Sequence, residues 1–406
     1  MTDFFPSGFF NGNRTKLQQI LDSDLIVIAA NGLLQRSADT TFSFRQDSNF
    51  WYLTGIEEPD YLLVINSGST FLIAPKRPDH RDLWDGVVDK GAIKARSGIK
   101  QIEEHHQGWI RLDLLLKKYK KVHTIAPAEA YIDSFGFYAN PARGALLHSL
   151  SKHRKLEIVD NRKPLARMRQ IKQPEELAAL QTAIGITTST LLAVRKKLPK
   201  YKFESELSAD ITHMFLKKGA GGHAYQPIVA CGPNAATIHY IDNDKPVGSG
   251  ELLLLDVGAE VCNYSADITR TYAVSPPTRR QRAVHAAVER VYEKAVGLIR
   301  PGLNMRKYEA GVDKIMAKEL KKLGLLDDLN DKKKLKRYYP HLTSHFLGLD
   351  THDAADYDQP LSAGMVLTVE PGIYIPEEGI GVRIEDDVLF TKNGVFNLSA
   401  SLPRSL

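Results

Sequence analysis

Two aspartates at the ends of β-type runs are the first residues of this sequence whose positions suggest chemistry. The four leucines Leu252–Leu255 precede Asp256, a pattern typical of a buried strand that ends in a carboxylate. A desolvated carboxylate is costly unless it is paired, hydrogen-bonded or bound to a metal. After a polar turn, Asp267 opens a second β-type run. Each aspartate alone is more often a turn or cap residue, so this hairpin-like unit is only a candidate ligand pair.

The same pattern occurs a second time nearer the C-terminus. The apolar run Met365–Val369 ends in Glu370, and the run Gly381–Phe390 contains Glu385. Alternate residues of a strand share a face, so we expect Arg383 to point the same way as Glu385 and to hold that carboxylate ionised. A single buried ion pair is the simpler explanation of these two residues. The duplication of strand pairs with two acids each favours a ligand set.

Histidines are concentrated between the two acidic units. His341, His345 and His352 fall within a short stretch, although the chain has only 13 histidines. His341 and His345 alone could be a pair on a helix surface. Because His345 is followed by Phe346 and Leu347, we expect it to be partly buried, where a neutral imidazole is a good metal ligand.

Four carboxylates and one imidazole form a hard donor set, which suits Mn(II), Co(II) or Zn(II). The four negative charges balance two divalent ions and leave a large excess for a single ion. Two ions a few Å apart can share a bridging water and lower its pKa, which gives hydroxide near neutral pH. The sequence therefore predicts a dinuclear metal centre.

The elements that position these residues follow from the periodicity of apolar residues. Short strands and helices alternate up to about residue 160, and longer amphipathic helices follow. Pro174 with the acids Glu175 and Glu176 predicts the start of one long helix. The prediction is an α/β (α+β) chain with one domain over 1–165 and a second over 166–406. The segment Arg36–Gly55 has no clear periodicity, and the charged segment Asp327–Arg337 is expected to be a solvated loop or helix face.

The other expected elements are short β-type runs and amphipathic helices. The strands are expected at Leu25–Ala30, Tyr61–Asn66, Thr70–Ala74, Pro227–Ala230, Leu252–Val257, Asp267–Val274, Met365–Val369 and Gly381–Phe390. The helices are expected at Arg14–Leu21, Ile110–Tyr119, Phe203–Lys218, Thr278–Ile299 and Met305–Leu323.

The composition is that of a soluble globular protein. A hydrophobic fraction of 43% and a charged fraction of 25% exclude intrinsic disorder and collagen-like repeats. The net charge of +6 does not argue for a nucleic-acid partner. Cys231 and Cys262 are too few for a disulfide framework or a cysteine zinc site, which favours a reduced compartment. With neither a signal peptide nor a run of about 18 apolar residues, we expect a cytoplasmic protein without a membrane partner.

In chain order, the five candidate ligands resemble those of the pita-bread metallopeptidases: Asp256, Asp267, His345, Glu370 and Glu385. The motifs LLLLDVGAEVCNYSADITRTY, SHFLGLDTHD, LTVEPGIY and GVRIEDD are similar to those of the proline-specific branch, the Xaa-Pro aminopeptidases and prolidases. RSADTTFSFRQDSNFWYLTG is similar to the non-catalytic domain of that branch. The resemblance covers nearly the whole chain. It implies an aminopeptidase P N-terminal domain followed by a pita-bread catalytic domain.

The resemblance also implies a substrate site, made by His239, His341, His352 and Tyr225. Arg383 matches the arginine beside the last ligand. Trp84 matches an aromatic residue that a neighbouring subunit brings toward the active site, with ordinary core or interface packing as the alternative.

The implied reaction is hydrolysis of the bond before proline by a hydroxide that bridges two divalent ions. Mn²⁺ is the first expectation for these ions, with Co²⁺ or Zn²⁺ as alternatives. Glu370 would be both a ligand and the group that carries the proton. His352 would donate a hydrogen bond to the tetrahedral intermediate, and His239 would help to fix the substrate.

Three alternatives to an Xaa-Pro aminopeptidase remain at this point. A prolidase would act on Xaa-Pro dipeptides, and the match around RQDSNFWYLTG and the compact length favour the aminopeptidase instead. A metal-free creatinase-like enzyme and a non-catalytic pita-bread binding module should both have lost ligands, whereas all five are present here. The expected partners are peptides with proline at the second position and further copies of the chain, in a homodimer or homotetramer.

Overall fold

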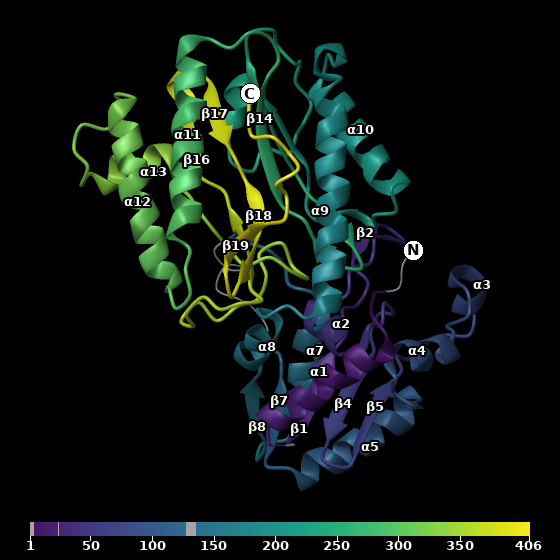
Figure 1. Cartoon of the computed structure of the whole chain (residues 1–406). Coiled ribbons are helices and arrows are strands. Elements are labelled where there is room, and N and C mark those ends of the chain that lie inside the picture. The colour runs from purple at the N-terminus through teal and green to yellow at the C-terminus, as the bar shows by residue number, and fades with distance from the viewer. Residues whose placement is uncertain (1–3, 23, 127–134) are drawn as a thin grey trace. The chain divides into compact units, whose positions relative to one another are not determined.

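The computed structural model describes residues 4–22, 24–126 and 135–406 (Figure 1), so the first residues of the predicted N-terminal domain and residues 127–134 lie outside it. The chain divides into two compact units. The described residues up to Ala166 form the N-terminal unit, and Arg167–Leu406 form the C-terminal unit. Both units mix helices and strands, which confirms the predicted α/β class.

The N-terminal unit is built on a six-stranded sheet with the strand order β6-β5-β4-β1-β7-β8. Only β4 is antiparallel to its neighbours, and the other adjacent strands are parallel. The strands are β1 (Leu25–Ala29), β4 (Leu62–Asn66), β5 (Ser69–Ile73), β6 (Gln101–Glu103), β7 (Lys121–Thr124) and β8 (Glu157–Asp160). The helices and two short outer strands are α1 (Ser7–Ile20), α3 (Arg81–Asp85), α4 (Lys90–Ser97), α5 (His105–Lys118), α7 (Pro141–Ser151), β2 (Gln35–Ser37) and β3 (Thr40–Thr41). α8 (Arg162–Arg169) crosses the boundary between the two units.

The helix α2 (Ser48–Thr54) forms inside the segment that shows no periodicity. Asp47 caps it by accepting hydrogen bonds from two backbone N–H groups of the first turn, and Gly55 ends it with a φ of 67°. All seven residues of α2 are buried, so the helix has no polar face that could produce a periodic pattern.

The C-terminal unit places its strands between two pairs of helices (Figure 1). α9 (Pro174–Arg195) and α10 (Glu204–Lys217) lie on one side, and α11 (Arg279–Leu298) and α12 (Met305–Lys322) lie on the other. All four helices are confirmed predictions. α9 begins as expected with Pro174, and it has the length and hydropathy of a membrane span. Because α9 packs against α10 and the strands beside it, a core helix accounts for that composition, although the sequence alone predicts no stretch close to spanning length.

The strands of this unit form small antiparallel sheets. The strands are β9 (Gly222–His223), β10 (Ile228–Cys231), β11 (Leu252–Val257), β12 (Ala259–Val261), β13 (Tyr264–Ser265), β14 (Ile268–Ala273), β15 (Val366–Val369), β16 (Gly372–Ile375), β17 (Ile380–Arg383), β18 (Asp386–Thr391) and β19 (Gly394–Asn397). The sheets are β10-β11-β14, β13-β12-β9, β15-β18-β19 and β16-β17. As predicted, β11 and β14 pair, with Asp256 opposite Thr269. The connection between them is a second hairpin, β12-β13, which turns at Cys262 and Asn263 with positive φ angles of 48° and 66°.

The predicted strand Gly381–Phe390 is wrong, because it is broken into β17 and β18, which belong to different sheets. Ile384 and Glu385 lie in the break. The N–H of Ile384 donates to the carbonyl of Pro371, and the N–H of Glu385 donates to the carbonyl of Thr269. These two bonds turn the chain from one sheet to the other, so Arg383 and Glu385 do not share the face of one strand.

Two further segments can be compared with the sequence predictions. The charged segment contains α13 (Lys332–Tyr338), capped by Asp331, and most of its side chains are exposed, which confirms a solvated helix face. In the N-terminal unit, Trp84 on α3 is 79% exposed, so the alternative prediction that Trp84 packs in the core is wrong.

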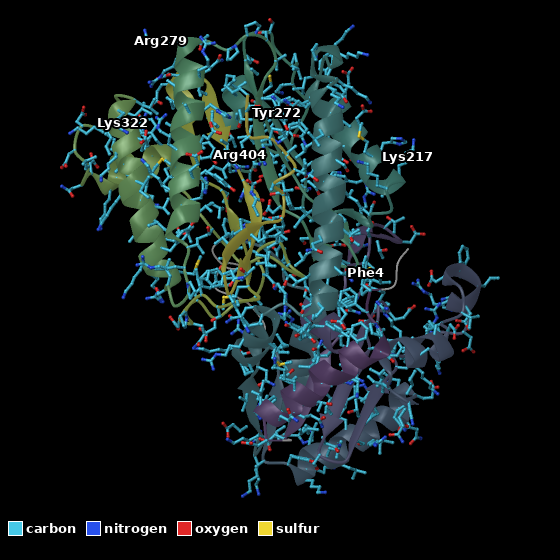
Figure 2. All side chains as sticks on the ribbon, viewed as in Figure 1. Phe4, Lys217, Tyr272, Arg279, Lys322 and Arg404 are labelled. Atoms are coloured by element: carbon cyan, nitrogen blue, oxygen red, sulfur yellow. The ribbon has the colours of Figure 1, made fainter. Side chains whose placement is uncertain are left out.

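The segment that follows β19 is attached to β14 by hydrogen bonds. Arg270 donates to the backbone carbonyls of Leu402 and Pro403. Arg404 is labelled in Figure 2. Its guanidinium lies over the ring of Tyr292 on α11. The segment after β19 therefore packs between α11 and the sheet.

Candidate metal centre

Five elements bring the predicted ligands together in the C-terminal unit. Asp256 is the next-to-last residue of β11, and Asp267 directly precedes β14. His345 lies beside β15, because its N–H donates to Thr368 Oγ1 and its carbonyl accepts from the N–H of Thr368. Glu370 directly follows β15, and Glu385 occupies the break between β17 and β18. Ligand atoms of Asp267, His345 and Glu385 all lie within 4.8 Å of one another.

The two aspartates are joined by Tyr225. Its hydroxyl lies 2.6 Å from Asp256 Oδ1 and 2.6 Å from Asp267 Oδ1. The Tyr225 ring also lies next to Gly258, where a Cβ atom would come within 1.8 Å of the Ala266 carbonyl oxygen. Glycine is therefore required for this close approach. The structure places the Tyr225 hydroxyl on the carboxylates, and its expected contact with substrate stays a prediction.

The tautomer of His345 is set by the backbone. Its Nδ1 faces the carbonyl oxygen of Phe346 at 3.1 Å, and a carbonyl can only accept a hydrogen bond. Nδ1 therefore carries the proton in the neutral ring, and the lone pair is on Nε2. Nε2 lies 3.4 Å from Asp267 Oδ2 and 3.4 Å from Glu370 Oε1. The free nitrogen of the imidazole thus faces the carboxylates.

Arg383 organises the opposite side of the centre. Its guanidinium forms an ion pair with Asp256 and donates to Thr269 Oγ1 at 3.0 Å and to the Tyr374 hydroxyl at 2.8 Å. The Thr269 hydroxyl donates in turn to Glu385 Oε2 at 2.6 Å. Although the strand is broken, Arg383 and Glu385 converge on the same threonine.

The pKa shifts of these residues indicate that the cluster lacks positive charge. Burial, the largest cause, raises the pKa of Asp256 although Arg383 opposes the shift. Burial also raises the pKa of Glu370 to about 8, and burial together with Asp267 and Glu370 raises the pKa of Glu385 well above its usual value. Burial disfavours the His345 imidazolium, but the hydrogen bond to Asp267 and the charge of Glu370 raise its pKa to about 9. The raised pKa values of Asp256, Glu370 and Glu385 mean that added positive charge would favour their ionised forms.

The remaining predicted histidines lie around this cluster. His341 Nε2 is 2.8 Å from the Tyr374 hydroxyl, and its Nδ1 is 3.6 Å from Glu370 Oε2. The ring of His352 packs edge-on against His345 with a centroid distance of 4.2 Å. His239 is close enough to contribute to lowering the pKa of both His341 and His352, after desolvation of each ring by the surrounding protein as the main cause. His239 and His352 are exposed, so they form an open rim above the buried acids.

Sequence reasoning missed three residues that support the ligands. Thr269 links Arg383 to Glu385, as described above. Asp387 Oδ2 accepts the N–H of Asp267 at 3.1 Å, and Glu309 accepts the N–H groups of the two residues that precede His345. Thr269 lies two residues after Asp267 in a β-type run, and this spacing could have placed it on the same face. The other two contacts join distant segments and leave no local signal.

The residues present fit divalent metal ions. The donor set of four carboxylates and one imidazole suits hard or borderline cations, and the cluster needs added positive charge. In its neutral form the imidazole also presents its unprotonated nitrogen, and its other nitrogen is held by a backbone carbonyl, as is usual for metal-bound histidine. Asp256, Asp267, His345, Glu370 and Glu385 are therefore the residues that would hold the ions.

Known proteins identify the class to which this fold and site belong. The family model described as metallopeptidase family M24 matches residues 178–392, and the model described as aminopeptidase P, N-terminal domain, matches residues 10–123. The chain belongs to metallopeptidase family M24, and its C-terminal unit is the pita-bread domain of that family. The predicted family, the hydrolase class and the dependence on divalent metal are confirmed.

Within this family, the chain is similar to Xaa-Pro aminopeptidases. It is 33% identical to the Xaa-Pro aminopeptidase of Escherichia coli and 32% identical to that of Haemophilus influenzae, in each case over 99% of this chain and 96% of the relative. The structure of E. coli aminopeptidase P with the inhibitor Pro-Leu matches with a TM-score of 0.85 and 31% identity, over 98% of this chain and 96% of that chain. Pseudomonas aeruginosa aminopeptidase PepP matches with a TM-score of 0.86 and 28% identity, over 99% of this chain and 96% of that chain.

Proposed function

We propose that this chain is an Xaa-Pro aminopeptidase with a dinuclear metal centre. It would release the first residue from peptides that carry proline at the second position. The observation that carries the proposal is the convergence of Asp267, Glu370 and Glu385 on the His345 imidazole, with Asp256 joined to Asp267 through the Tyr225 hydroxyl. Two divalent ions would balance the four negative charges. Mn²⁺ is our first choice, and Co²⁺ or Zn²⁺ also suit this donor set.

When bound, the two ions would supply a nucleophile at neutral pH and polarise the scissile carbonyl. Glu370 borders both His341 and His345, so it can take a proton from the attacking group and deliver it to the leaving nitrogen of proline. His352 is exposed beside His345 and would donate a hydrogen bond to the carbonyl oxygen as that oxygen gains charge. Arg383 would keep Asp256 ionised and oriented.

The substrate class follows from the rim of histidines. Proline at the second position gives a tertiary amide without an N–H and with a fixed φ, so a site for this bond cannot depend on that N–H. His239, His341 and Tyr225 would instead fix the substrate from the side of the rim. The similarity to Xaa-Pro aminopeptidases over both units supports this assignment.

The test measures how fast Mn²⁺-loaded protein cleaves three kinds of peptide. Xaa-Pro-Yaa tripeptides should be cleaved with a higher kcat/KM than the matching Xaa-Pro dipeptides, because an aminopeptidase leaves the side beyond proline open. An Xaa-Ala-Yaa control should be cleaved far more slowly. A better dipeptide substrate would make the enzyme a prolidase, and failure to cleave any Xaa-Pro peptide would refute the proposal.

We also propose that the enzyme works in the cytoplasm on peptides, as a homodimer or homotetramer, without a nucleic-acid or membrane partner. Cys231 and Cys262 form no disulfide in the described part of the chain, which agrees with a reducing compartment. The exposed Trp84 on α3 is available for contact with another subunit. Light scattering on the purified protein measures the assembly directly, and a monomer at micromolar concentration would refute this part of the proposal.

A further inference from the structure

A fully buried glutamate connects the start of α10 to the loop that carries His239. Glu204 is the first residue of α10, and it is 0% exposed. Its Oε1 accepts from the Cys231 N–H at 2.8 Å and from Asn234 Nδ2 at 3.0 Å. Its Oε2 accepts from the Tyr240 hydroxyl at 2.8 Å and from the Lys245 N–H at 3.0 Å. One carboxylate therefore receives four hydrogen bonds.

These donors lie on both arms of one segment, which we call the His239 loop (residues 232–245, with Cys231 directly before it). Asn234 and Tyr240 stand on either side of His239 in the sequence, and both side chains donate to the same carboxylate. The backbone of Glu204 adds a further bond, because its N–H donates to the carbonyl of Lys245 at 2.9 Å. The carboxylate thus joins the two arms of the loop on either side of His239 in the sequence.

Other contacts hold the two ends of the loop, and Ile238 and Tyr240 in its middle pack against an apolar cluster on β10, β11 and β16. At the start, a Cβ atom on Gly381 of β17 would lie 1.9 Å from the Ala235 carbonyl oxygen, so the short helix Gly232–Ala236 packs directly on β17. Near the end, Asn243 accepts the N–H of Val229 and donates to the carbonyl of Pro227.

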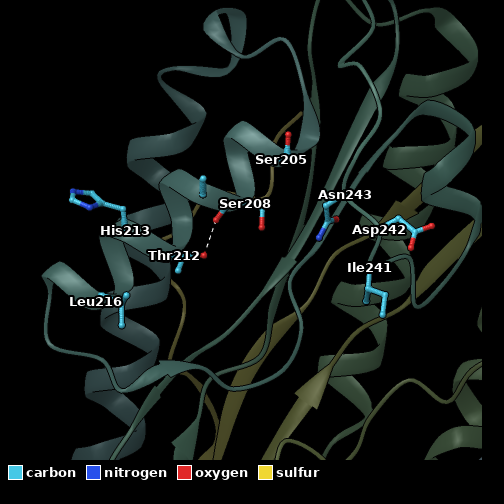
Figure 3. Close-up of a pocket in the computed structure, with 9 residues that line it drawn as sticks. Ser205, Ser208, Thr212, His213, Leu216, Ile241, Asp242 and Asn243 are labelled. Atoms are coloured by element: carbon cyan, nitrogen blue, oxygen red, sulfur yellow. Dashed lines mark hydrogen bonds between the residues drawn. The ribbon is translucent and has the colours of Figure 1, made fainter. Parts of the chain in front are cut away.

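An open cavity borders the last part of the loop. This cavity, of about 640 Å³, lies between residues 241–243 and the face of α10 that carries Ser205, Ser208 and Thr212 (Figure 3). Side-chain packing on α10 therefore does not support residues 241–243 from this side. The hydrogen bonds to Glu204 take over that task at the first turn of α10.

Only an ionised carboxylate can satisfy all four donors. It has four lone-pair sites and no hydrogen to donate. A glutamine side chain has an NH₂ group in place of one oxygen, so in either orientation it would face two donors. At one end these donors are the Cys231 N–H and the Asn234 amide, and at the other they include the Lys245 N–H, which cannot rotate to accept. A buried backbone N–H would lose its partner in each case.

We propose that Glu204 is a positioning residue that fixes the His239 loop, and with it the His239 ring, at the open rim of the metal centre. Glu204 does not touch substrate itself, and it acts through His239. The inference rests on the proposed function in one respect, namely that His239 binds the substrate. The fixation of the loop does not depend on that function.

The test uses Glu204→Gln in the full chain, with Glu319→Gln as the matched control. Glu319 is also 0% exposed, but it lies on α12 and joins that helix to α11 through Arg290. Amide hydrogen exchange should rise at least about tenfold in residues 232–245 of Glu204→Gln, the effect of one lost buried hydrogen bond. The same segment should exchange as in the wild type in Glu319→Gln. Equal exchange in all three proteins would overturn the proposal.

Kinetics then test whether Glu204 acts through His239. In the Mn²⁺-loaded enzyme, Glu204→Gln should raise KM for an Xaa-Pro-Yaa peptide by about tenfold with bound metal unchanged. Adding Glu204→Gln to His239→Ala should cause little further loss, because the positioned ring is already absent. Fully additive losses would overturn the role in positioning. If the wild type cleaves no Xaa-Pro peptide, the proposed function fails, while the exchange result still decides whether Glu204 fixes the loop.

A milder variant keeps the proposal testable if Glu204→Gln does not fold. Tyr240→Phe removes one of the four donors and leaves the carboxylate and the ring in place. Exchange in residues 232–245 should rise by a smaller factor, and the increase in KM should again be absent in the His239→Ala background. A Tyr240→Phe protein with wild-type exchange and KM would refute the proposal.

Discussion

Removing the Tyr225 hydroxyl tests whether the metal ligands are held in place by a residue that is not itself a ligand. Tyr225→Phe deletes one oxygen, which lies 2.6 Å from a carboxylate oxygen of each aspartate. The ring that packs beside Gly258 is unchanged. The substitution therefore alters the orientation of Asp256 and Asp267 and leaves all five ligands present.

The expected magnitude follows from the single hydroxyl hydrogen. One O–H can donate to only one carboxylate at a time, so the loss is one hydrogen bond to a charged group, or about 1.5–3 kcal/mol. That range corresponds to a factor of about 10–100 in binding, which is also the usual cost of losing a group that orients a metal ligand. We therefore expect Tyr225→Phe to bind Mn²⁺ about 10–100-fold more weakly than the wild type.

The assay is calorimetric titration of chelator-treated protein with Mn²⁺, together with melting temperatures of the metal-free proteins. Tyr272→Phe is the matched control, because Tyr272 is a buried tyrosine on β14 whose hydroxyl has no hydrogen-bond partner among the described residues. It should bind Mn²⁺ like the wild type. If Tyr225→Phe binds Mn²⁺ as tightly as the wild type or more tightly, the hydroxyl stabilises the metal-free acids and does not orient them for the ions, and the reasoning fails.

Three further predictions concern the reaction, the metal and pH. His352→Ala should lower kcat by roughly 100-fold, because the role of His352 lies in the transition state. Bound metal and melting temperature should not change, because the side chain is exposed. A fall in melting temperature with unchanged kcat would mean a structural role. Chelation should abolish activity, and Mn(II) or Co(II) should restore it; full activity of chelated protein would exclude the metal centre. Asp267→Asn should hold less metal by elemental analysis, because an amide is a neutral and weaker ligand than a carboxylate. Burial raises the pKa of Glu176 to about 7, above its value in the unfolded chain, so the folded state binds the extra proton between about pH 4.5 and pH 7. The free energy of unfolding should fall as pH rises through that window, and Glu176→Gln, followed by urea unfolding, should gain stability relative to the wild type at pH 8 but not at pH 4.5. An equal difference at both pH values would contradict this assignment.

Local signals in the sequence were sufficient to predict most of the C-terminal unit. α9 was predictable from Pro174 and the acids of its first turn, and β11 from its four leucines. The pairing of β11 with β14 followed from two β-type runs on either side of a turn. The ligand types followed from the cost of burying carboxylates, and the structure brings those side chains together.

Features that depend on distant partners were not predictable. The strand breaks at Glu385 because the N–H of Glu385 donates to the carbonyl of Thr269, 116 residues earlier, and this hydrogen bond competes with continuation of the strand. α1 begins at Ser7, well before the predicted start at Arg14, and its buried face is hard to read from the sequence because Asn13 and Arg14 on that face are polar and bond to distant backbone carbonyls. α2 is buried on all sides, so it shows no periodicity of an exposed helix. Glu204 and Glu309 could not be singled out, because their partners lie in loops far along the chain.

The break between β17 and β18 also has a consequence for how the protein folds. It fastens Glu385 to a strand 116 residues earlier, and Arg383 likewise reaches back 127 residues to Asp256. A metal centre assembled from such distant segments does not exist while only the earlier part of the chain has folded, so the ions cannot nucleate folding. They bind after assembly and then oppose separation of the segments, which slows unfolding without accelerating folding. During synthesis, Asp256 and Asp267 leave the ribosome as an incomplete pair, and the last strands of the chain determine when the enzyme can take up its ions.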